Sequence, residues 1–131
     1  MSSMHGLSRT ALAHAQREVQ RLVDELTGVT AAVVATVDGF DVASATTGDT
    51  DPARVAAMGS SIAAIGGVVG EEASLGRRES VMVLTDSGFA VFQSVHRRDI
   101  QLVINVLARA SAVPAMVAWR AAQLARTLAE A

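Results

Sequence analysis

The sequence predicts an α+β sandwich, in which a five-stranded, mostly antiparallel sheet carries helices on both faces. Apolar residues recur with helical spacing in three segments, and five short segments rich in β-branched or apolar residues lie between them. One of those strands, residues 81–84, is apolar on both faces, so the sheet needs cover on both sides. The predicted order is helix, two strands, helix, three strands and helix.

The first helix is expected over residues 8–26, where the chain shows one apolar stripe and then Thr27-Gly28. That stripe consists of Leu12, Ala15, Val19, Leu22 and Leu26. A hairpin follows, with strands at 29–37 and 40–45 around the tight turn Asp38-Gly39.

The central helix is expected to begin at Asp51-Pro52, a cap followed by proline at the first helical position, and to end at Gly76. Residues 55–70 contain no charged side chain. The large residues of this helix form one stripe, which we expect to face the core: Val55, Met58, Ile62, Ile65 and Val69. A stripe of small residues lies about 110° away and is expected to receive a second helix: Gly59, Ala63, Gly66 and Gly70. Four glycines in one helix cost about 3–4 kcal/mol relative to alanine, and close approach of two backbones is the usual compensation.

Three further strands are expected at 79–85, 89–95 and 100–107, and a last helix opens at Val113-Pro114. The first and last helices would share one face of the sheet, and the central helix would cover the other. Residues 1–7 are expected to be a flexible tail, and residues 8–131 a single domain.

The composition excludes several functional classes. The chain has 131 residues, of which 50% are apolar and 18% charged, so an oligomer is expected. A net charge of −2 gives no attraction to nucleic acid. There is no cysteine and no lysine, which removes thiolate metal sites, Schiff bases and a P-loop lysine. The uncharged stretch is too short for membrane insertion, and no signal peptide precedes it, so we expect a cytoplasmic protein.

No set of residues with catalytic, cofactor-binding or metal-binding spacing stands out. The glycine-rich run 66–70 lies within a helix, whereas phosphate-binding loops precede one. His5, His14 and His96 have no metal-ligand spacing. Two exposed arginine pairs and a tryptophan off the core stripe remain as possible partner contacts: Arg77, Arg78, Arg97, Arg98 and Trp119. The arginines could equally be solvated turn residues, and Trp119 could pack at the helix edge.

The order of elements and several motifs resemble the roadblock/dynein-light-chain family over nearly the whole chain. The resembling parts are residues 22–26 followed by Gly28-Val29, the strand 32–37 with Asp38-Gly39-Phe40, the small-rich helix from Val55, and the hairpin 81–95 around Asp86-Ser87-Gly88.

The resemblance implies a homodimer, or a heterodimer with a paralogue, in which edge strands join two sheets and the long helices lie side by side. It assigns strand pairing to residues 79–85, including Val81 and Val83, and helix contact to the stripe of small residues. It also implies a non-catalytic regulator of a Ras-like small GTPase. The alternatives are a nucleotide-independent scaffold and a small enzyme or ligand sensor.

Overall fold

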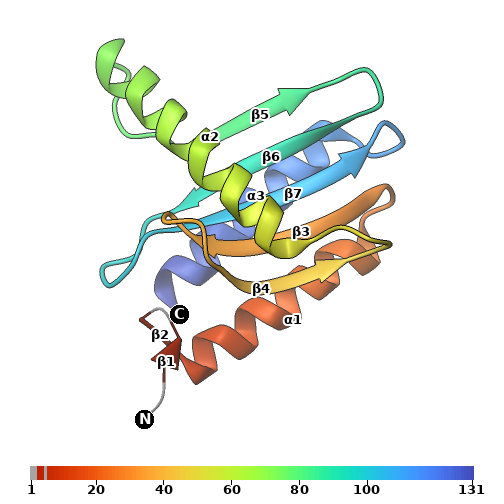
Figure 1. The fold of residues 1–131 in the computed structure, drawn as a ribbon, viewed down its shortest axis with the longest axis horizontal. Coiled ribbons are helices and arrows are strands. Elements are labelled where there is room, and N and C mark those ends of the chain that lie inside the picture. The colour runs from red at the N-terminus through yellow and green to blue at the C-terminus, as the bar shows by residue number, and fades with distance from the viewer. Residues whose placement is uncertain (1–2, 5) are drawn as a thin grey trace.

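The computed structural model describes residues 3–4 and 6–131 and confirms the predicted fold class (Figure 1). The main sheet has five strands in the order β4-β3-β7-β6-β5, and every neighbouring pair is antiparallel. The elements are β1 (Ser3–Met4), β2 (Leu7–Ser8), α1 (Arg9–Glu25), β3 (Val29–Thr36), β4 (Asp41–Thr46), α2 (Pro52–Glu72), β5 (Ser80–Leu84), β6 (Gly88–Val95), β7 (Leu102–Arg109) and α3 (Pro114–Glu130).

Helices cover both faces of this sheet, as expected. Helices α1 and α3 lie on one face, where α1 packs over β3 and β4 and α3 packs over β6 and β7. Helix α2 crosses the other face diagonally (Figure 1). The larger core belongs to the α1/α3 face and includes Val19, Leu22, Ile104, Val117 and Leu128. Two smaller clusters lie beneath α2.

The start of the domain lies earlier than predicted. Leu7 is only 1% exposed and belongs to the core beneath α1. Ser8 is the N-cap of α1, because its hydroxyl oxygen accepts a hydrogen bond from the Ala11 N–H at 3.1 Å. The predicted tail 1–7 is therefore wrong at Leu7, while His5 lies outside the described residues.

Helix α2 is oriented opposite to the prediction. Its small residues Gly59, Ala63 and Gly70 are buried against the chain's own sheet and loop, so they are not open to a second helix. The large residues Met58, Ile65 and Val69 are 50%, 60% and 53% exposed. Only Val55 is fully buried from the large stripe, and Ile62 packs partly against the core. The close approach that the glycines permit is helix to sheet, not helix to helix.

Particular atoms account for this close approach. A Cβ at Gly59 would overlap Asn105 Oδ1, one at Gly66 would lie 2.8 Å from Val81 Cγ2, and one at Gly70 would overlap the Gly76 carbonyl oxygen. Asn105 is fully buried in β7, and its Nδ2 donates to the carbonyls of Val33 at 3.0 Å and Val103 at 3.2 Å. Its Oδ1 meets no donor in the described part of the chain and lies against Gly59.

The two ends of α2 differ from each other in how well the sequence predicts them. Asp51 caps the helix as expected, accepting from the Ala53 N–H at 3.0 Å. The helix ends at Glu72, before Gly76, because the chain turns through Ser74 at φ 56°. The N–H groups of Leu75 and Gly76 then bond the Gly70 carbonyl at 2.8 and 3.2 Å.

By length and composition α2 also qualifies as a membrane-spanning helix. The core helix of a soluble protein passes the same test when it is mostly buried, whereas only 28% of the apolar window of α2 is buried. Here the residues that face the sheet anchor the helix to the rest of the domain.

The contact between Gly59 and Asn105 gives a stability prediction. Gly59→Ala should destabilise the fold by about 1–3 kcal/mol, since the added methyl displaces either α2 or Asn105. Gly67→Ala is the matched control in the same helix. Its Cβ would lie 3.2 Å from the flexible Arg78 Nη1, so the gain in helix propensity should stabilise by up to about 1 kcal/mol. Thermal unfolding at equal protein concentration measures both, and equal midpoints for the two variants would contradict the contact.

Candidate interaction surfaces

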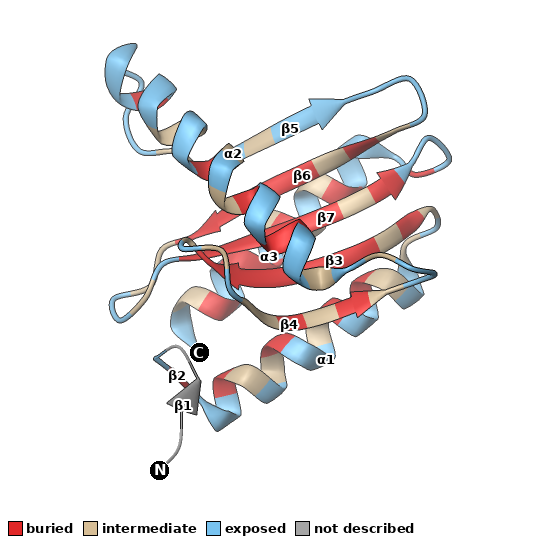
Figure 2. Cartoon of the chain, viewed as in Figure 1, coloured by how far each residue is buried: buried red, intermediate tan, exposed pale blue. Residues whose placement is uncertain are grey.

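The outer side of α2 forms the main exposed apolar surface, which we call the α2 surface. It consists of Met58, Ile65, Val68 and Val69 of α2, together with Leu75 of the loop that follows the helix. Figure 2 shows that most of the C-terminal half of this helix is exposed, whereas the strands beneath its N-terminal half are buried. An apolar helix with this much exposed surface is typical of a site that another protein covers.

Strand β5 is the edge of the sheet next to this surface, and among the strands of the described residues it pairs with β6 alone. Cross-strand partners share a face, so the register Val81 with Phe92 and Val83 with Ala90 places both valines on the α2 face. Met82 and Leu84 pair with Val91 and Phe89, which places them on the α1/α3 face. Leu84 is 68% exposed and Met82 39%. The edge therefore offers unpaired backbone groups together with apolar side chains on both faces.

Helix α2 does not cover the same area as the α2 face of the sheet beneath it. The C-terminal end of α2 extends past β5, while the hairpin end of β5 and β6 is uncovered on the same face (Figure 1). At that hairpin end a hollow is lined by residues that include Val83, Ala90 and Leu107. One side of the domain thus projects an apolar helix end, and the other side presents an apolar hollow.

Among the arginine candidates, Arg97 has a structural role. Its side chain is 8% exposed and makes a two-pronged ion pair with Asp99, at 2.8 Å from Nε and 2.9 Å from Nη2. Its Nη1 donates to the carbonyls of Leu128 at 2.5 Å and Ala131 at 3.0 Å, at the C-terminal end of α3. The hydrogen bond from Arg97 holds the pKa of Asp99 below its ordinary value. Arg97 is therefore not an exposed side chain, which contradicts both its interpretation as a possible partner contact and its interpretation as a solvated turn residue.

The other three arginines lie in two loops at the same end of the sheet, Arg77 and Arg78 before β5 and Arg98 between β6 and β7. Arg98 is exposed, and the exposed Arg77 pairs with Glu79 at 3.4 Å. Arg78 is half-buried, with its side chain over Gly67. His96, which precedes Arg97-Arg98, connects the two loops, because its Nε2 lies 3.2 Å from the Arg78 carbonyl and 3.4 Å from Glu79 Oε1.

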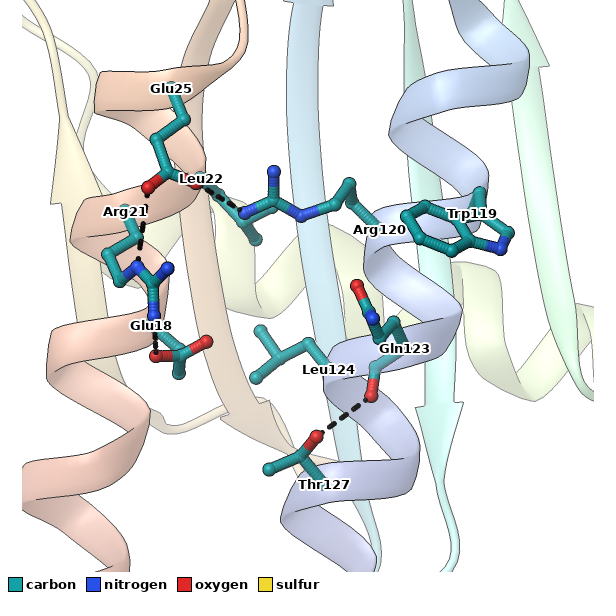
Figure 3. A pocket seen from close by; sticks show the side chains of 9 residues that line it. All are labelled: Glu18, Arg21, Leu22, Glu25, Trp119, Arg120, Gln123, Leu124 and Thr127. Atoms are coloured by element: carbon teal, nitrogen blue, oxygen red, sulfur yellow. Dashed lines mark hydrogen bonds and ion pairs between the residues drawn. The ribbon is translucent and has the colours of Figure 1, made fainter.

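Trp119 lies on the opposite face of the sheet, apart from these arginines. It is 56% exposed and lines a hollow of about 390 Å³ between α1 and α3 (Figure 3). Arg120 Nη2 bridges the two helices by bonding Glu25 Oε1 at 2.9 Å, and Arg21 pairs with Glu18 and Glu25 at 3.2 and 3.4 Å. These pairs lower the pKa of Glu25, chiefly through Arg120, and raise that of Arg21, chiefly through Glu25. The charges in the hollow therefore neutralise one another.

The arrangement offers apolar surfaces and an open strand edge for protein contact. No three metal-ligating side chains lie together within the part of the chain that the structure describes. The glycine run 66–70 lies inside α2, where Gly66 and Gly70 face the sheet and the following loop. It therefore has no geometry for cradling a phosphate.

Sequence reasoning missed two of these features. The reversed orientation of α2 depends on Asn105, a polar residue between the apolar runs 102–104 and 106–108 of β7, and that residue was the available signal. The burial of Arg97 had a weaker signal, namely Asp99 two residues further on.

Comparisons with known proteins agree with the fold. The sequence profile of the Roadblock/LC7 domain matches residues 15–104. The Roadblock/LC7 domain from Streptomyces avermitilis is 21% identical, with a TM-score of 0.77, over 86% of this chain and 92% of that one. The gliding protein MglB from Thermus thermophilus is 13% identical, with a TM-score of 0.81, over 99% and 96%. An MglB in a tetrameric arrangement is 14% identical, with a TM-score of 0.82, over 99% and 96%. No protein with a curated function matches the sequence.

The two neighbouring arginines 97 and 98 should behave differently on substitution. Arg97→Ala should lower the free energy of unfolding by about 1–3 kcal/mol, because it removes the ion pair with Asp99 and the hydrogen bonds to the carbonyls of Leu128 and Ala131. Arg98→Ala, the matched control, should change it by less than about 0.5 kcal/mol. Denaturant unfolding monitored by circular dichroism measures both, and equal midpoints would show that the Arg97 contacts contribute nothing to stability.

Proposed function

Since the chain belongs to the Roadblock/LC7 domain family, we propose that it is a non-catalytic, dimeric regulator of a Ras-like small GTPase in the cytoplasm. The observation that carries the proposal is the exposed α2 surface beside the open edge of β5. The partner in the dimer is a second copy of this chain, or a paralogue with the same edge.

In the proposed dimer, β5 of each copy pairs antiparallel around a two-fold axis at Met82. That register sets Val81 opposite the second copy's Val83 on the α2 face. It sets Met82 opposite itself on the other face. Edge pairing satisfies the free backbone groups of β5 and continues one sheet through both copies. Val81 and Val83 remain in the interface on this proposal, as the sequence resemblance implies.

The same two-fold axis accounts for the projecting end of α2. Because α2 extends past β5, its C-terminal half lies over the sheet of the second copy. The hollow at Val83, Ala90 and Leu107 is the apolar area available there. Each copy thus covers the hollow of the other, which is the reciprocal contact that a two-fold interface requires. The large residues Ile65, Val68 and Val69 replace the small stripe as the proposed helix contact.

The dimer can be tested by disulfide cross-linking, because the natural sequence has no cysteine. Met82→Cys should form an intermolecular disulfide under mild oxidation, since directly opposed Cβ atoms lie about 4.5–5.5 Å apart, close to disulfide distance. Ser87→Cys, at the exposed turn of the same hairpin, is the matched control and should remain monomeric on a non-reducing gel. Light scattering on the unmodified protein should give twice the chain mass. A monomeric mass, or equal cross-linking of both variants, would overturn the dimer.

The regulatory part of the proposal is supported by the family and by the kind of surfaces present. The resemblance associates bacterial chains of this type with Ras-like GTPases, and the MglB neighbours share the fold. Arg77, Arg98 and Trp119 are the exposed candidates for the GTPase contact. A nucleotide-independent scaffold is the alternative, and it uses the same dimer.

Binding to the Ras-like GTPase encoded nearest to this gene tests the regulator. The dimer should bind the form loaded with a non-hydrolysable GTP analogue at least about tenfold more tightly than the GDP form, about 1.4 kcal/mol. Calorimetric titration of both forms measures the ratio. Arg77→Ala and Trp119→Ala, on opposite faces, then identify which surface is used. Equal affinity for both nucleotide forms would favour the scaffold, and no binding to either would reject GTPase regulation.

A further inference from the structure

We propose that two equivalent ion pairs join the copies of the dimer, each between Glu72 of one copy and Arg109 of the other. This inference rests on the β5 pairing proposed above. It also names the partner, which is a second copy of this chain and not a paralogue. Glu72 is the last residue of α2 and Arg109 the last residue of β7, and both are exposed.

Arg109 lies at the hollow that the second copy's α2 is proposed to cover. Alternate residues of a strand share a face, so Arg109 is on the same face as Leu107, which packs beneath α2. The hollow has apolar side chains at Val83, Ala90 and Leu107, and Arg109 is the only charged residue among the described residues that line it. Within the part of the chain that the structure describes, its guanidinium forms no ion pair. The hollow therefore presents an unpaired cation beside an apolar area.

Glu72 lies on the flank of α2 that faces the second copy. At 100° per residue it shares this flank with Ile65 and Val69, which belong to the proposed helix contact. Glu71 lies about 100° away around the helix, where it lines a different hollow together with Arg78. The two neighbouring glutamates therefore have different surroundings, and Glu72 is the one directed toward the second copy.

The register of the sheet places the two charges near each other. Arg109 lies three residues along the strands and two strands inward from Met82, so it is about 10 Å along and about 12 Å across from the two-fold axis. Gly66 packs on Val81 of β5, and Glu72 lies about 9 Å further along the diagonal course of α2 (Figure 1). The two-fold axis turns the hairpin end of one copy toward the loop end of the other, so the end of α2 arrives beside the second copy's Arg109. Both side chains are long and flexible, and their charged groups close the remaining gap.

These ion pairs determine the choice of partner more than the affinity. Exposed ion pairs contribute little net stability, whereas like charges placed together at an interface oppose association. The apolar contacts of α2 and β5 fit any chain with similar apolar residues. The charges require a glutamate at the end of α2 and an arginine at the end of β7 in both partners. Two identical copies meet that requirement twice.

Exchanging the two charges tests the inference. Glu72→Arg and Arg109→Glu should each weaken self-association at least about tenfold, because like charges then meet at two places in each homodimer. An equimolar mixture of the two variants should recover the affinity of the natural dimer, since a glutamate faces an arginine at both places in the mixed dimer. Light scattering over a dilution series measures all three samples. The loss in each single variant should shrink in about 1 M salt, where the screening length falls to about 3 Å.

Glu71→Arg is the matched control, because it makes the same change one residue away on a different side of α2. It should leave self-association unchanged. Recovery in the mixture also shows that both single variants fold.

The outcomes separate this inference from the dimer. A monomeric mass for the natural protein removes both the dimer and the ion pairs. If the natural protein is a dimer and Glu72→Arg and Arg109→Glu self-associate as it does, the ion pairs alone are overturned. Weak association that persists in the mixture also overturns them, and so does an equal loss in Glu71→Arg.

Discussion

The fold depends on how closely the backbone of α2 approaches the sheet. Gly59 lies against the buried amide of Asn105, and Gly70 lies against the loop that follows the helix, so the small side of α2 faces inward. Once that contact is made, the large residues of the helix can only point outward. The glycines that weaken the helix by about 1 kcal/mol each are therefore the reason that its apolar residues are exposed.

Much of the fold could be predicted because local patterns decided it. The Asp51-Pro52 start, the Asp38-Gly39 turn and the stripe of α1 each reflect physics within a few residues of the chain. The orientation of α2 could not be predicted in this way. It is set by Asn105, which lies 46 positions after the Gly59 that it contacts. The spacing of apolar residues cannot decide which of the two stripes of α2 faces the sheet.

In the candidate site, too, local sequence patterns predict the position of some residues, and contacts with distant segments determine the position of others. The helical spacing predicts that Trp119 lies off the core stripe of α3, and its side chain is 56% exposed. Arg97 and Arg98 are adjacent and look alike in sequence, yet one is buried and the other exposed. The difference arises because the end of α3 reaches the loop after β6 and offers Arg97 two carbonyl oxygens. Contacts between segments far apart in the chain assign those roles, and no local pattern records them.

The projecting end of α2 also bears on how the protein is made and maintained. A newly folded single copy carries an apolar helix end and an open strand edge at the same place, which are the features that quality-control proteases and aggregating chains recognise. In the proposed dimer the helix end and the strand edge are covered, so the stability of the folded chain increases with the concentration of the protein. The lifetime of the protein in the cell would then rise with its abundance. The amount of protein would therefore change steeply near a threshold rate of synthesis.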